Sequence, residues 1–214
     1  MRLTIVGCSG SFPGPQSPAS SYLVQAEHAG RTWSILLDFG NGSLGVLQRF
    51  VDPGTIDAVF LSHLHPDHCL DLCGLYVMQK YRPGGAAEHR IPVWGPGGVD
   101  SRLAMAYAGI EEGSGMSTVF DFWLLGHQFP VEIGPFQVMP YRVNHPVESF
   151  GLRVEAGGSV LAYTGDTDTC GTLSPLMTGA NVVLADSAFM EGRDDASRGV
   201  HLTGRRAAQA AIVA

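Results

Sequence analysis

The stretch Ser62-His63-Leu64-His65-Pro66-Asp67-His68 decides how the rest of this 214-residue chain is interpreted. It places three imidazoles and one carboxylate within six residues, directly after an apolar run that predicts a short strand. Imidazole and carboxylate are the ligands that zinc and related divalent ions prefer. His63 and His65 alternate along an extended segment and can point the same way, while Asp67 and His68 can face a neighbouring position. The spacing therefore favours two adjacent metal ions over a histidine-rich surface loop.

Short strands and helices are expected on both sides of this cluster. The predicted strands are residues 3–6, 22–26, 32–37, 56–61, 91–94, 136–143, 150–155, 160–163 and 181–185, of which the first and the last are expected to be buried. The predicted helices are residues 42–50, 69–81, 99–108, 173–178 and 203–213, the last with Thr203 as a possible N-cap. Helices interspersed in two runs of strands indicate an α/β fold with a two-sheet core covered on both faces.

The charge of the chain bears on its partners. The net charge is −7 with 45% apolar residues, and we find no basic stripe that could neutralise the phosphates of a nucleic acid. The only basic doublet, Arg205-Arg206, is expected to decorate a helix face. A nucleic-acid partner is therefore not expected, whereas a small phosphorylated substrate stays compatible, because bound metal ions carry positive charge locally.

The cysteines and the hydropathy bear on the compartment. Cys8, Cys69, Cys73 and Cys170 show no CxxC zinc pattern and are expected to be small buried thiols. The opening residues 1–6 are too short for a signal peptide, and no apolar run approaches the length of a membrane span. We therefore expect a cytoplasmic protein without a membrane partner.

The pattern His63-x-His65-x-Asp67-His68 resembles the HxHxDH motif of the metallo-β-lactamase superfamily. Two later segments match in the same order, Asn144-His145-Pro146 and Tyr163-Thr164-Gly165-Asp166-Thr167. The resemblance covers nearly the whole chain. It implies one domain over residues 1–214, an αββα sandwich of two mixed β-sheets flanked by helices.

The resemblance also implies a ligand set for two divalent metal ions, zinc in the first place, with manganese or iron as alternatives. His63, His65 and His145 would bind one ion, Asp67 and His68 the other, and Asp166 would bridge both. The family usually supplies a last histidine from a strand after the C-terminal helix. Here the sequence stops at Ala214 within the helical pattern. We therefore expect a domain without that strand and ligand, whether by truncation, by an open second site, or because another subunit supplies the ligand.

Two more segments resemble the ribonuclease Z-like and cyclic-nucleotide phosphodiesterase branch of the family. They are Val183-Leu184-Ala185-Asp186 and His201-Leu202-Thr203-Gly204. In such enzymes the histidine, supported by a carboxylate, is placed to protonate the leaving oxygen. The implied catalytic residues are His201, Asp186 and Asp67, which could orient the attacking hydroxide as well as bind metal.

The implied function is that of an enzyme, a metallo-hydrolase that cleaves cyclic nucleotides or another small phosphodiester through a metal-activated hydroxide. Ribonuclease Z normally carries a long exosite arm for transfer RNA between the segments matching His145 and Asp166. Those residues are only 21 apart here, which leaves room for a hairpin. A ribonuclease Z-type transfer-RNA 3′ endonuclease and a non-catalytic metal-binding domain remain the alternatives. Dimers are common among the relatives, so a homodimer is a further expectation.

Overall fold

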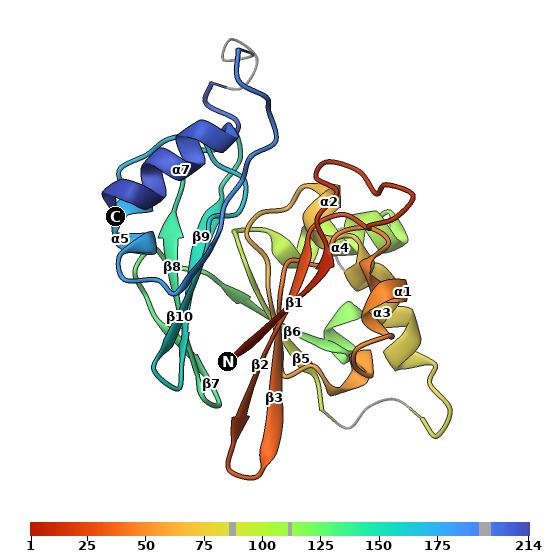
Figure 1. Ribbon diagram of the computed structural model, residues 1–214. Coiled ribbons are helices and arrows are strands. Elements are labelled where there is room, and N and C mark those ends of the chain that lie inside the picture. Colours follow the sequence, from red (N-terminus) through yellow and green to blue (C-terminus); the bar gives the residue numbers. More distant parts are fainter. Residues whose placement is uncertain (86–88, 111–112, 193–197) are drawn as a thin grey trace. The chain divides into compact units, whose positions relative to one another are not determined.

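The computed structural model describes residues 1–85, 89–110, 113–192 and 198–214 (Figure 1). The chain forms two compact units, Arg2–Leu124 and Leu125–Ala214, the second of which also takes in Met1. Each unit has its own sheet and its own helices, and each is described by itself below.

The first unit is built on a six-stranded mixed sheet in the order β1-β2-β3-β4-β5-β6. The strands are β1 (Arg2–Gly7), β2 (Ser21–His28), β3 (Arg31–Leu37), β4 (Ala58–Phe60), β5 (Ile91–Gly95) and β6 (Phe120–Leu124). β1, β2 and β3 pair antiparallel, and β3 to β6 pair parallel. The turn between β2 and β3 uses Ala29 and Gly30, both with positive φ, as a tight hairpin on right-twisted strands requires.

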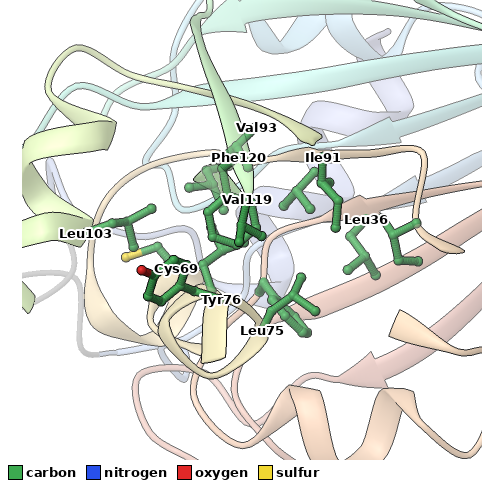
Figure 2. Close-up of a cluster of buried hydrophobic side chains, with 14 of the residues drawn as sticks. Leu36, Cys69, Leu75, Tyr76, Ile91, Val93, Leu103, Val119 and Phe120 are labelled. Atoms are coloured by element: carbon green, nitrogen blue, oxygen red, sulfur yellow. The ribbon is translucent and has the colours of Figure 1, made fainter. Parts of the chain in front are cut away.

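Helices pack on this sheet and bury its core. They are α1 (Ser43–Leu47), α2 (Pro66–Cys69), α3 (Asp71–Lys80) and α4 (Val99–Ala108), with 3-10 turns η1 (Pro53–Thr55) and η2 (Met116–Thr118). Figure 2 shows Leu75 and Tyr76 of α3 and Leu103 of α4 in one cluster with strand side chains such as Val93 and Phe120. These side chains are almost completely buried, and Leu61 and Cys69, which flank the histidine loop, belong to the same close-packed cluster.

The second unit has a five-stranded mixed sheet in the order β11-β10-β9-β8-β7. The strands are β7 (Val131–Ile133), β8 (Phe136–Arg142), β9 (Phe150–Ala156), β10 (Ser159–Tyr163) and β11 (Val182–Leu184), and the helices are α5 (Leu173–Met177) and α7 (Gly204–Val213). β7 to β10 pair antiparallel, and β11 pairs parallel to β10. Leu173 and Leu176 of α5 and Ala207 of α7 share a cluster with Tyr141 and Ala162 of the sheet.

The α/β class with two mixed sheets and helices is confirmed. Three details were wrong. β6 and β7 were not predicted, although β6 pairs with β5 along its whole length and β7 pairs with β8. β1 and β11 were expected to be buried, yet Ile5 and Val182 are exposed, because each of these strands lies at the edge of its sheet. The helix expected over 69–81 is divided into α2 and α3 at Leu70.

The helices bear on the question of a membrane span. Among the helices that the structure describes, none combines the length and the apolar character needed to cross a lipid bilayer.

Candidate metal centre

The histidine loop leaves the end of β4 and turns at once into α2. Leu61 donates its N–H to the carbonyl of Trp94 at 2.7 Å, so the chain stays bonded to the sheet until the loop begins. Pro66 then opens α2, where its fixed φ suits the first helical position and its missing N–H leaves no unpaired donor. His63, Asp67 and His68 are buried. The motif residues therefore lie on a rigid strand-to-helix corner.

A close backbone approach holds this corner against the neighbouring loop. A Cβ on Gly40 would lie 1.8 Å from the carbonyl oxygen of Asp67, so only glycine fits. The N–H of Phe39 also donates to the carbonyl of His68 at 2.7 Å. The segment after β3 thus packs directly under the first turn of α2.

His63 and His65 lie with their rings close together, in agreement with the prediction that alternate residues can point the same way. His63 Nε2 and His65 Nδ1 are 3.0 Å apart. Two nitrogen ligands at about 2.0–2.1 Å from one tetrahedral ion lie about 3.3 Å apart. The donor set therefore fits a divalent ion with little adjustment.

Asp38 orients His68 and was not predicted from the sequence. Its carboxylate is fully buried and accepts from the Ser62 N–H at 2.6 Å, from Ser62 Oγ at 2.7 Å and from His68 Nδ1 at 2.7 Å. Because a carboxylate only accepts, the proton of His68 is on Nδ1, and Nε2 is left as a ligand atom. His68 Nε2 lies 3.2 Å from Asp67 Oδ2. The one sequence signal was an aspartate directly after the apolar run of β3.

The second unit gathers Asp166, Asp186 and His201. One carboxylate oxygen from each aspartate and one ring nitrogen of His201 lie within 4.8 Å of one another, a group that could hold a metal ion. His201 Nδ1 is 2.8 Å from Asp186 Oδ2 and 3.9 Å from Asp166 Oδ2. The N–H of Thr167 donates to Asp186 at 3.1 Å and keeps that carboxylate in place. The pairing of His201 with a carboxylate agrees with the arrangement that the resemblance implied.

His145 belongs to the same unit. Its Nδ1 lies 2.9 Å from the carbonyl oxygen of Val200, and its ring packs edge-on against His201 with 5.4 Å between centroids. A carbonyl accepts only, so Nδ1 carries the proton and Nε2 keeps its lone pair. His145 therefore has the tautomer that a metal ligand needs.

The predicted site residues thus fall into two groups, one in each unit. His63, His65, Asp67 and His68 lie together at the end of β4, and His145, Asp166, Asp186 and His201 lie together in the second unit. In the first group, two pairs of ligand atoms are close, His63 Nε2 with His65 Nδ1 at 3.0 Å and His68 Nε2 with Asp67 Oδ2 at 3.2 Å. In the second group, Asp166, Asp186 and His201 could hold a metal ion together.

The cysteines take no part in either group as ligands. Burial raises the pKa of Cys69 to about 12, so this residue stays a neutral thiol, and its Sγ lies 3.3 Å from the carbonyl oxygen of His65. The expectation of buried thiols is confirmed for Cys69 and is wrong for Cys8, which is exposed in the polar loop after β1, whereas Cys73 and Cys170 are only partly buried.

Comparison with known proteins now identifies the family. The family described as Beta-lactamase superfamily domain matches residues 34–213. The chain belongs to this family. The matched range contains every residue of the two groups above.

Individual relatives agree with this assignment. An uncharacterized protein of Mycobacterium leprae is 42% identical over 220 residues, covering 100% of this chain and 74% of the relative. The probable metallo-hydrolase YhfI of Bacillus subtilis is 27% identical and covers 93% of this chain and 77% of its own length. The crystal structure of YhfI, a metallo-β-lactamase fold protein, has a TM-score of 0.80 and 26% identity, covering 98% of this chain and 80% of that one. Human tRNase Z, short form, shares the fold at a TM-score of 0.79 and 22% identity, covering 100% and 88%.

Proposed function

We propose that this chain is a metallo-hydrolase that cleaves small phosphodiesters, with cyclic nucleotides as the leading substrate class. Membership of the superfamily and a relative named as a probable metallo-hydrolase support the hydrolase class. The phosphodiesterase assignment rests on one observation in particular, the pairing of His201 with Asp186 at 2.8 Å.

The proposal includes two divalent ions, zinc in the first place. His63, His65 and His145 would bind one, Asp67 and His68 the other, and Asp166 would bridge them. The donor chemistry supports this set, since the acceptors Asp38 and the Val200 carbonyl favour a proton on Nδ1 of His68 and of His145, the tautomer in which Nε2 carries a lone pair. Bound divalent ions would polarise phosphoryl oxygens and lower the pKa of water to about 7.

His201 would serve as the general acid. Its Nδ1 donates to Asp186, a carboxylate that favours the charged imidazolium, and Nε2–H then remains for a leaving oxygen. As water forms the new bond to phosphorus and the bond to the leaving oxygen breaks, the Nε2 proton would pass to that oxygen. Asp67 would orient the attacking water and accept its proton.

Two features support a small substrate over transfer RNA. The residues between His145 and Asp166 form the antiparallel strands β9 and β10, which leaves no long arm in that segment. The chain is also acidic, with a net charge of −7, whereas binding to nucleic acid relies on basic surfaces.

The test combines metal content with turnover. The purified chain, loaded with zinc, is assayed on cyclic AMP and on bis(p-nitrophenyl) phosphate, and bound metal is measured by elemental analysis. We expect about two ions per chain and turnover that is lost in His65→Ala. His28→Ala is the matched control, because His28 is an exposed histidine at the end of β2 and should leave both readouts unchanged.

Three results would overturn the proposal in different ways. Lack of turnover on both phosphodiesters with metal loaded would exclude a small-phosphodiester hydrolase. Cleavage of a precursor transfer RNA under the same conditions would assign the ribonuclease function instead. About one ion per chain, with no turnover on any ester, would indicate a non-catalytic metal-binding domain.

A further inference from the structure

We propose that Asp168 and Arg206 are positioning residues that hold His201 and His145 in their working orientations through the backbone of residues 199–201. The kinetic part of this inference rests on the proposed function. The pair lies wholly within the second unit, between the loop that follows β10 and the first turn of α7.

Asp168 connects its own loop after β10 to the segments around Asn144, Gly199 and Arg206. Its Oδ1 accepts from the Thr169 N–H at 2.6 Å and from Arg206 Nη1, and its Oδ2 accepts from the Gly199 N–H at 2.7 Å. Its own N–H donates to the carbonyl of Asn144 at 2.8 Å, next to His145. The side chain is largely buried, so these bonds form where little water competes for them.

Arg206 completes the arrangement from the helix. While Nη1 donates to Asp168, Nη2 donates to the backbone carbonyl of His201 at 3.1 Å. A guanidinium can serve both acceptors because its N–H groups form a rigid planar fork, whereas a lysine ammonium is one nitrogen and cannot occupy both positions. The expectation that Arg205-Arg206 decorates a helix face therefore applies to Arg205, which is exposed, and is wrong for Arg206, which turns inward.

The backbone held by this pair is the segment that orients both histidines. Gly199 is fixed by Asp168 on one side, and the carbonyl of His201 is fixed by Arg206 on the other. Between them, the carbonyl of Val200 receives Nδ1–H of His145, while the ring of His201 pairs with Asp186. If residues 199–201 moved, His145 would lose the acceptor that fixes its tautomer, and the ring of His201 would change direction.

The kinetic experiment separates positioning of an acid from general damage. Cyclic AMP expels a ribose oxygen that requires a proton, whereas bis(p-nitrophenyl) phosphate expels a stable phenolate that does not. For Arg206→Lys and Arg206→Met, assayed at saturating zinc, we expect kcat on cyclic AMP to fall about 10- to 100-fold further than kcat on the aryl ester. Both substrates need the metal ion that His145 would bind, but only cyclic AMP also needs the acid. Arg205→Lys and Arg205→Met are the matched controls on the same helix turn and should resemble the wild type.

A second measurement does not depend on turnover. Long-range proton–nitrogen spectra of ¹⁵N-histidine in the full chain, freed of metal by a chelator, report the tautomer of each ring. We expect His145 to be protonated on Nδ1 in the wild type and to become a mixture of tautomers in Arg206→Met and Asp168→Asn.

Equal losses of kcat on both substrates, or an unchanged His145 tautomer in both variants, would overturn the positioning role. A wild-type chain that hydrolyses neither substrate would instead refute the proposed function, and the histidine spectra alone would then decide the role of the pair. Comparable thermal midpoints for Arg206→Lys and the Arg205 controls guard against a folding defect.

Discussion

Replacing Asp38 by Asn should weaken metal binding by His68 while the chain still folds. The carboxylate accepts three hydrogen bonds, from the Ser62 N–H, from Ser62 Oγ and from His68 Nδ1. An asparagine that keeps Oδ1 on the Ser62 N–H turns its NH₂ toward His68 Nδ1. That nitrogen must then become an acceptor, and the imidazole proton moves to Nε2, the atom proposed to bind metal. Asp38 has a φ of 58°, a left-handed conformation that asparagine also tolerates, so the backbone needs no change.

The magnitudes follow from this geometry. One buried acceptor is exchanged for a donor, which should lower the free energy of unfolding of the metal-free chain by about 1–3 kcal/mol. Loss of the carboxylate behind a ligand histidine should weaken metal binding by about 10- to 100-fold. Asp57→Asn is the control, because Asp57 is a largely buried acceptor of the same unit that receives Arg31 Nη2 and the Ser34 N–H. It should cost stability and leave metal affinity unchanged.

The assay is zinc titration against a competing chelator, with urea unfolding of the metal-free chain measured in parallel. The reasoning requires a loss of affinity in Asp38→Asn that exceeds any loss in Asp57→Asn at similar stability. If both variants bound zinc as tightly as the wild type, Asp38 would be a structural residue only. If both lost affinity in proportion to stability, the tautomer argument would fail.

Three further outcomes are expected. Gly40→Ala should lower the free energy of unfolding in urea by about 1–3 kcal/mol, because the added Cβ meets the Asp67 carbonyl. Gly45→Ala, in open space on α1, should leave that free energy unchanged or raise it. Similar values for the two variants would contradict the close approach. Iodoacetamide at mildly alkaline pH should label Cys8 first and Cys69 only after unfolding, since burial raises the pKa of Cys69 to about 12; native labelling of Cys69, read by mass spectrometry, would disprove this. Burial acts to raise the pKa of Asp168, but hydrogen bonds from the Gly199 and Thr169 amides and the charge of Arg206 outweigh it and hold that pKa below its ordinary value. Its stabilising contribution is therefore present above the unfolded carboxyl pKa of about 3.9 and is lost as pH falls through the folded value, so the stability gap between the wild type and Asp168→Asn in urea unfolding should narrow in acid; a constant gap would refute the assignment.

The parts that the sequence predicted well are those determined by neighbouring residues. The helix predicted over residues 99–108 is α4 (Val99–Ala108), and Thr203 caps α7 as expected, by accepting from the Arg206 N–H at 3.4 Å. The histidine cluster lies within one loop, so its spacing alone indicated that His63 and His65 can point the same way, and their ring nitrogens lie 3.0 Å apart. β6 was not predicted because its apolar alternation is short and helix α4 separates it in sequence from its partner β5.

The long-range contacts of Asp38 and Asp168 could not be predicted in the same way. Asp38 meets His68 across 30 residues of sequence, and Asp168 meets Gly199 across 31. Only strand pairing and helix packing bring such residues together, and a single sequence carries no periodic pattern for that.

The same physical requirement nevertheless explains all these contacts. An imidazole presents one nitrogen to a ligand or substrate only when its other nitrogen is held by an acceptor. Asp38 does this for His68, Asp186 for His201, and the Val200 carbonyl for His145. In each case the acceptor bonds Nδ1. A motif can therefore predict that a histidine is a ligand, but the acceptor behind the ring determines its tautomer. The variants that best test this chain are consequently those that leave every histidine in place and change only its acceptor or the residues that hold that acceptor.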